Sequence, residues 1–141
     1  RVDAWVSLVD VAPTLAELLC LPGRADWQLQ LEGRSLVPYL RGETPPAAPV
    51  FAMSGHSYFP HLVRRRVRFD SAGRFRTVIE GRHKLIWTPG ATPGQRFELY
   101  DLVDDPEERS DLSDLEPKRR AALQHRLNAW MRRLRQLGYV E

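Results

Sequence analysis

Cysteine, lysine and long apolar runs are all scarce in this chain of 141 residues. The single cysteine, Cys20, excludes an internal disulfide bond and any zinc site built from several cysteines. No apolar stretch approaches the roughly 18–20 residues that a membrane-spanning helix needs, so we expect a soluble protein. The first residues, Arg1 to Asp3, are neither an initiator methionine nor a signal peptide, which favours truncation or processing upstream. They therefore do not indicate the cellular compartment of the parent protein.

Lysine is scarce: Lys84 and Lys118 are the only two lysines, and the other Lys or Arg residues of the chain are all arginines. Arginine offers a planar fork that can bind sulfate or phosphate with two hydrogen bonds. Biased codon usage would produce the same excess of arginine. The formal net charge of +3 does not distinguish one class of binding partner from another. The excess alone therefore leaves both interpretations open.

The N-terminal third is predicted to be helical. Asp10 is a suitable N-cap, Pro13 is tolerated in the first turn, and Gly23 is expected to end the helix. A second helical turn is expected at Ser35–Leu40, capped by Ser35. The apolar residues that follow helical spacing in the first helix are Val11, Leu15, Leu18 and Leu19.

The middle of the chain is predicted to form strands with short connections, which favours an antiparallel sheet of about four strands. After Pro117 an apolar stripe recurs at spacings of four and three and predicts one helix of about twenty residues, ended by Gly138. This helix would cover the sheet, so the fold class is α+β. The strands are expected at Pro49–Met53, Leu62–Phe69, Arg74–Ile79, His83–Trp87 and Phe97–Leu102, and the stripe comprises Leu123, Leu127, Trp130, Leu134 and Leu137.

Five phrases occur in a fixed order along the chain: VSLVDVAPTLAELL (6–19), LEGRSLVPYLRGE (31–43), PVFA (49–52), EGRHKLIW (80–87) and ELYDLVDDPEERSDL (98–112). Together they resemble the C-terminal portion of sulfatases, which belong to the alkaline-phosphatase-like superfamily. The resemblance implies that residues 1–43 are the end of the catalytic domain and that 44–141 form the C-terminal subdomain. An isolated piece of this kind should expose an apolar patch around Val11–Leu19.

The resemblance implies that the chemistry lies upstream of this chain. In sulfatases a formylglycine attacks a sulfate ester beside a divalent cation, usually calcium, and both belong to the earlier part of the enzyme. We therefore expect no catalytic residue, metal ligand or cofactor here. The expected partners are the missing N-terminal catalytic domain and, for the parent enzyme, a sulfate ester. Related phosphodiesterases and phosphonate hydrolases share this tail and remain an alternative.

The pentapeptide Cys20–Arg24 matches the C-x-P-x-R pattern whose cysteine becomes formylglycine in sulfatases. Gly23 stands where the family has Ser or Ala, no Thr-Gly follows, and no pair of aspartates precedes it. Cys20 also follows a predicted helix, so a coincidental match and a partly buried thiol are favoured. A genuine formylglycine precursor is the minor alternative.

Two further clusters are candidates for binding. His56, Tyr58 and His61 follow the first strand in a loop, and loops of this subdomain can border the substrate cleft in sulfatases. The two histidines lack the carboxylates and third ligand that a metal site needs. The run from Arg64 to Arg68 suits a solvated sheet face or docking onto an acidic surface; nucleic acid and membrane are not expected partners. A stand-alone, arginine-rich polyanion-binding module is the alternative function.

The acidic cluster near the last strand suggests calcium, but its spacing is not that of an EF-hand loop. We expect these carboxylates to accept hydrogen bonds from nearby backbone N–H groups. His83 replaces an aromatic residue of the family phrase, and a buried histidine would need a polar neighbour. The cluster comprises Asp104, Asp105, Glu107, Glu108 and Asp111.

Overall fold

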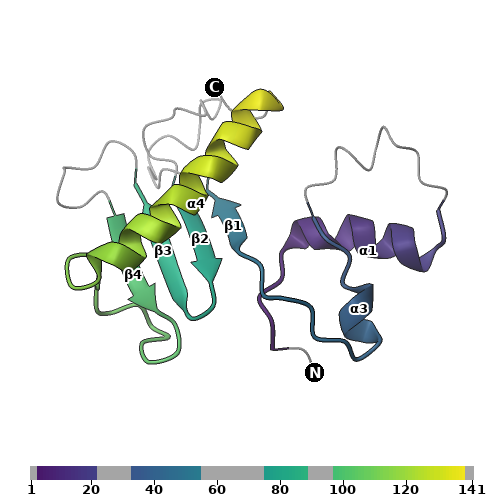
Figure 1. Cartoon of the computed structure of the whole chain (residues 1–141), viewed down its shortest axis with the longest axis horizontal. Coiled ribbons are helices and arrows are strands. Elements are labelled where there is room, and N and C mark those ends of the chain that lie inside the picture. The colour runs from purple at the N-terminus through teal and green to yellow at the C-terminus, as the bar shows by residue number, and fades with distance from the viewer. Residues whose placement is uncertain (1–2, 22–32, 55–74, 89–96, 139–141) are drawn as a thin grey trace, which may run out of the picture. The chain divides into compact units, whose positions relative to one another are not determined.

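A computed structural model describes residues 3–21, 33–54, 75–88 and 97–138 of the chain (Figure 1). The chain divides into two compact units, Arg1–Val50 and Phe51–Glu141. The predicted α+β class is confirmed, with a four-stranded sheet and a long C-terminal helix in the second unit and helices in the first. The assignment of residues 1–43 to the end of a catalytic domain stays a prediction.

The first unit contains a short 3-10 turn, η1 (Leu8–Asp10), which runs directly into α1 (Val11–Leu18). Asp10 precedes α1 as predicted, but its backbone is already helical, with φ −76° and ψ −17°. Its carboxylate is therefore turned back toward the start of η1, where it accepts a hydrogen bond from the N–H of Ser7 at 2.8 Å. The cap thus stabilises the 3-10 turn that precedes the helix.

The end of α1 differs from the prediction that Gly23 closes it. The N–H of Leu21 donates to the carbonyl of Ala16 at 3.0 Å, and the N–H of Cys20 donates to Glu17 at 3.1 Å. These two bonds make a Schellman motif, in which Cys20 occupies the left-handed position, with φ +49°, that glycine usually takes. The helix ends earlier because these two bonds satisfy its last carbonyls; Gly23 lies outside the described residues.

The second helical segment is shorter than expected. Helix α3 spans Val37–Leu40, with Pro38 in its first turn, where a missing N–H costs no hydrogen bond. The predicted capping residue Ser35 accepts a hydrogen bond from the N–H of Val37 at 3.2 Å through its hydroxyl. Ser35 therefore contributes to the start of the helix, although Leu36 is the residue that immediately precedes it.

The second unit is built on a sheet in the order β1-β2-β3-β4. Strands β2 and β3 pair antiparallel, as do β3 and β4, and this register places Val78, Leu85 and Leu99 side by side. Gly81 has a φ of +60° at the first of two turn residues, which lets β2 return directly as β3. The expected strand at Leu62–Phe69 lies outside the described residues. The strands are β1 (Val50–Met53), β2 (Arg76–Glu80), β3 (His83–Trp87) and β4 (Phe97–Asp101).

Helix α4 (Pro117–Gln136) crosses one face of this sheet (Figure 1). Its Leu123 and Leu127 are each 1% exposed and join the three aligned strand residues in a core. The predicted stripe is wrong at its far end, where Met131 is buried and Leu137 is 45% exposed. Trp130 is half-buried and stacks on Phe51 at 5.0 Å between ring centroids. Met131, and not Trp130, therefore continues the buried face of α4 toward Leu134.

Candidate functional site

Two cations of the β2–β3 hairpin are held by carboxylates at the end of β4 and in the segment that follows it. Arg82 Nε lies 2.5 Å from Asp101 Oδ2, and its guanidinium also pairs with Asp104. Lys84 Nζ lies 2.7 and 2.8 Å from the two carboxylate oxygens of Glu108. We call these five residues the hairpin brace. They join the phrase EGRHKLIW to the phrase ELYDLVDDPEERSDL.

The electrostatics of the Arg82–Asp101 pair favour a permanent ion pair. The hydrogen bond from Arg82 lowers the pKa of Asp101 to about 2, and the N–H groups of Val103 and Asp104 add to that effect. The same hydrogen bond raises the pKa of Arg82 above its ordinary value. Asp101 is therefore charged throughout the neutral range and does not exchange protons there, as a general acid or base would have to.

Two carboxylates of the acidic cluster, Asp105 and Asp111, bind backbone groups as predicted, whereas Glu107 pairs with Arg109. Asp111 accepts hydrogen bonds from the N–H groups of Leu99 at 2.9 Å and Ser113 at 2.8 Å, and from the Ser113 hydroxyl at 3.0 Å. Asp105 accepts one from the N–H of Ser110 at 2.8 Å. Within the part of the chain that the structure describes, no group of three or more His, Cys, Asp or Glu side chains is arranged to hold a metal ion.

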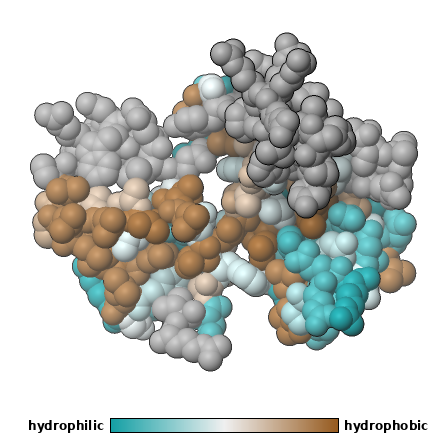
Figure 2. Space-filling model, turned by 180° about the vertical axis from the view of Figure 1, so that it is seen from behind, coloured by the Kyte–Doolittle hydropathy of each residue, from teal (hydrophilic) through white to brown (hydrophobic). Residues whose placement is uncertain are grey.

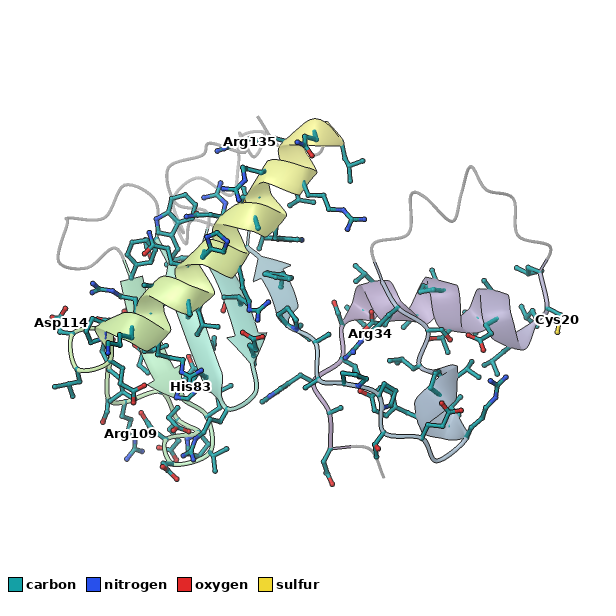
Figure 3. All side chains as sticks on the ribbon, in the orientation of Figure 1. Cys20, Arg34, His83, Arg109, Asp114 and Arg135 are labelled. Carbon is teal, nitrogen blue, oxygen red and sulfur yellow. The ribbon has the colours of Figure 1, made fainter. Side chains whose placement is uncertain are left out.

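His83 is buried beside the brace, and its position is shown in Figure 3. Its Nε2 lies 3.7 Å from Glu116 Oε2 and 4.0 Å from Asp101 Oδ2. The prediction that a buried histidine here needs a polar neighbour is confirmed. His83 thus connects β3 to the start of α4 and acts as part of the scaffold.

A second polar cluster connects the two ends of the first unit. The Asp10 side chain is 4% exposed and accepts a hydrogen bond from the N–H of Arg34 at 2.9 Å, besides that from Ser7. Thr14, one helical turn further on, accepts a hydrogen bond from the N–H of Leu36 at 2.9 Å. The sequence predicted Asp10 only as a helix cap. The spacing of four residues between Asp10 and Thr14 was the signal that could have indicated their shared contact with residues 34–36.

Gly33 makes this connection possible because the chain passes the backbone of η1 very closely. A Cβ atom on Gly33 would lie 2.0 Å from the carbonyl oxygen of Val9. No side chain fits at that distance, so only glycine can occupy the position. The phrases around Asp10 and Gly33 therefore form one interlocked unit.

The first unit exposes an unusual amount of apolar surface, as Figure 2 shows over α1. No residue of α1 is buried, and Leu8 of η1 is 89% exposed. The apolar patch expected around Val11–Leu19 is therefore present. We define the η1–α1 apolar face as the large hydrophobic residues Val6, Leu8, Val9, Val11, Leu15, Leu18 and Leu19, all between 46% and 89% exposed.

The predicted cleft residues His56, Tyr58 and His61, and the run Arg64–Arg68, lie outside the described residues. Cys20 is described, and its thiol is exposed at the end of α1, which corrects the expectation of a partly buried thiol (Figure 3). The left-handed backbone of the helix end turns it outward.

Comparisons with known proteins agree with the sequence resemblance at the level of the fold. The sequence matches no protein-family model. The structure of a phosphonate monoester hydrolase from Agrobacterium radiobacter is similar, with a TM-score of 0.67 and 21% identity, over 94% of this chain and 26% of that one. A putative sulfatase from Bacteroides thetaiotaomicron has a TM-score of 0.65 and 26% identity, over 88% of this chain and 24% of its own.

A third structure, bound to its substrate D-glucosamine-2-N,6-O-disulfate, has a TM-score of 0.64 and 20% identity, over 90% of this chain and 24% of its own. The chain therefore spans about a quarter of the length of these proteins. Its fold is one that sulfatases and phosphonate monoester hydrolases of the alkaline-phosphatase-like superfamily contain, as the ordered phrases predicted. None of the described helices combines the length and apolarity needed to cross a bilayer.

Proposed function

We propose that this chain is the C-terminal part of a sulfatase-type hydrolase and that it completes the fold of an upstream catalytic domain. The η1–α1 apolar face carries the proposal. Each large apolar side chain gains about 1.5–3 kcal/mol on full burial, so a face of this size favours contact with another part of the protein. The quarter-length match supports the same interpretation, because the larger part of such an enzyme would precede this chain.

The reaction we propose for the whole enzyme is hydrolysis of a sulfate ester, with a formylglycine nucleophile and a calcium ion supplied upstream. Asp101, Glu108 and Asp111 do not fit as calcium ligands, because cations and backbone N–H groups already bind them. Phosphonate ester hydrolysis is the second candidate, favoured by the similarity to a phosphonate monoester hydrolase. We further propose that His56, Tyr58 and His61 contact the substrate.

The ester class is tested with two small chromogenic substrates, an aryl sulfate and an aryl phosphonate. We expect the protein that includes the upstream region to hydrolyse one of them and this chain alone to hydrolyse neither. Alanine at His56 or His61 should raise KM more than it lowers kcat. Turnover by the pure chain would overturn the proposal that the reaction centre lies elsewhere.

Docking is tested with charged substitutions on the apolar face. Leu15→Glu in the full-length protein should abolish activity or soluble yield, because it would place a charge in a dry interface. Leu115→Glu is the matched control, since Leu115 is 77% exposed in the second unit, outside the η1–α1 apolar face. Equal, small effects of both substitutions would show that the η1–α1 apolar face does not dock.

A further inference from the structure

Helix α4 carries seven cations and no carboxylate along its twenty residues. Its buried side chains, Leu123, Leu127, Met131 and Leu134, lie on one face, so the cations occupy the others. All but Arg120 are exposed. Figure 3 shows Arg135 near the C-terminal end of the helix. The cations are Lys118, Arg119, Arg120, Arg126, Arg132, Arg133 and Arg135.

Only some of these cations have a carboxylate partner. Arg120 pairs with Asp114 at 3.4 Å, and Arg126 pairs with Glu80 at 2.7 Å. By contrast, across the described ranges no hydrogen bond or ion pair reaches the charged groups of a further four, namely Lys118, Arg119, Arg132 and Arg135. The hairpin brace shows that this protein pairs cations closely elsewhere.

Helix stability does not account for the arrangement. Like charges three or four positions apart, such as Arg132 and Arg135, destabilise a helix by about 0.2–0.5 kcal/mol. Arginines in the last turn interact favourably with the helix dipole, but Lys118 and Arg119 lie in the first turn, where the dipole disfavours cations. An external polyanion would compensate both costs.

The spacing of the unpaired cations defines the size of that partner. Arg119 and Arg132 are thirteen residues apart, which corresponds to roughly 20 Å along a helix. Lys118 and Arg132 are four turns apart and share the face opposite the core. An open groove beside Lys118 and Arg119 is also lined by Leu115, Pro117, Ala122 and Glu116, and it offers an apolar surface next to the charges. A single small ester cannot reach both ends.

We propose that the solvent face of α4 binds a polysulfated polysaccharide, held by one cation pair at each end of the helix. This inference rests on the proposed function and extends it, because it makes the substrate a polymer that is held outside the cleft. Three of the four unpaired cations are arginines, whose planar fork matches a sulfate group with two hydrogen bonds. Sulfate groups repeated along a polymer would supply negative charge to both ends at once.

The test compares three double variants of the full-length protein, using heparin as the probe. Lys118→Gln with Arg119→Gln removes one end, and Arg132→Gln with Arg135→Gln removes the other. Glutamine keeps the helix propensity. The control, Arg41→Gln with Arg109→Gln, removes two exposed charges from outside α4. We expect each α4 variant to lose about tenfold in affinity and about two units in the salt-dependence slope, and the control to lose less than about twofold.

Chain length separates this proposal from simple anion binding. A sulfated disaccharide should bind weakly and equally to all three variants, because it cannot span the helix. Unchanged heparin affinity in both α4 variants would overturn the inference, as would equal affinity for duplex DNA of the same length. Hydrolysis of the small aryl ester should stay unchanged in the α4 variants. Loss of polymer binding with intact hydrolysis supports the inference, whereas polymer binding without any hydrolysis would count against the proposed function alone.

Discussion

The ammonium nitrogen of Lys84 lies within 2.8 Å of both carboxylate oxygens of Glu108, which follows it by twenty-four residues. Glu108 also has a φ of +56°, a left-handed conformation that costs a residue with a side chain about 1–2 kcal/mol. Glycine would avoid that cost but would lose the ion pair. At this position, therefore, the ion pair with Lys84 of β3 is kept at the cost of an unfavourable backbone conformation.

Glu108→Gln should lower the free energy of unfolding by about 1–2 kcal/mol, because it removes a charged acceptor from a partly buried pair. The two side chains are 21% and 31% exposed. Urea unfolding measures the change. Glu107→Gln is the control, since Glu107 and Arg109 form a pair that is 62% and 78% exposed and should contribute less than about 0.5 kcal/mol. Equal effects would contradict the assigned role of Glu108.

Stability should depend on pH through Asp101. Its pKa is lowered from 3.8 to about 2 by Arg82, so the pair stabilises the folded state fully above about pH 4. That contribution is lost as the pH falls toward 2, because Asp101 then becomes protonated in both states. The urea midpoints of the wild type and Asp101→Asn should differ at pH 6 and converge near pH 2. Asp114→Asn, at a 94% exposed side chain, should give a small difference throughout.

Gly33→Ala should disrupt the first unit, because its Cβ would collide with the carbonyl of Val9. We expect a loss of about 3 kcal/mol or more. Hydrogen exchange at the N–H groups of Arg34 and Leu36 reports the change, since both bond to η1–α1. Gly42→Ala is the matched control: its φ of +82° costs about 1–2 kcal/mol, but no atom lies within 4 Å of the added methyl. Unchanged exchange in Gly33→Ala would refute the close approach.

Asp111→Asn should be tolerated, at a cost below about 1 kcal/mol, because an amide oxygen can still accept from the N–H groups of Leu99 and Ser113. Asp111→Ala should cost about 1–3 kcal/mol, because it leaves those groups without their acceptor. Thermal unfolding of the two variants gives the comparison. Equal losses for asparagine and alanine would mean that the negative charge, and not the acceptor, matters, because both variants lack the charge.

Local patterns predicted β3 at His83–Trp87 without error and predicted a helix of about twenty residues after Pro117, because alternation and apolar spacing act over a few residues. The same patterns missed Met131 and the end of α1. The face of α4 that is buried depends on how the helix crosses the sheet, and the end of α1 depends on two backbone hydrogen bonds around Cys20.

The candidate site likewise has features that local patterns predicted and features that depend on tertiary packing. The carboxylates after β4 were predicted to bind backbone N–H groups, since their spacing excludes an EF-hand loop. Their pairing with Arg82 and Lys84 required the register of β3 against β4, which places residues far apart in the chain within hydrogen-bonding distance. Linear spacing does not contain that register. The cleft residues His56, Tyr58 and His61 stay predictions.

The order of apolar residues, turns and caps along the chain determined the fold class, and the five ordered phrases supplied the resemblance to sulfatases. Only the tertiary structure decided that Asp10 binds Arg34, that Lys84 binds Glu108 and that Met131 is buried in α4. The physical reason is distance along the chain: local backbone preferences are written in neighbouring residues, whereas these contacts and exposures exist only after distant segments have packed.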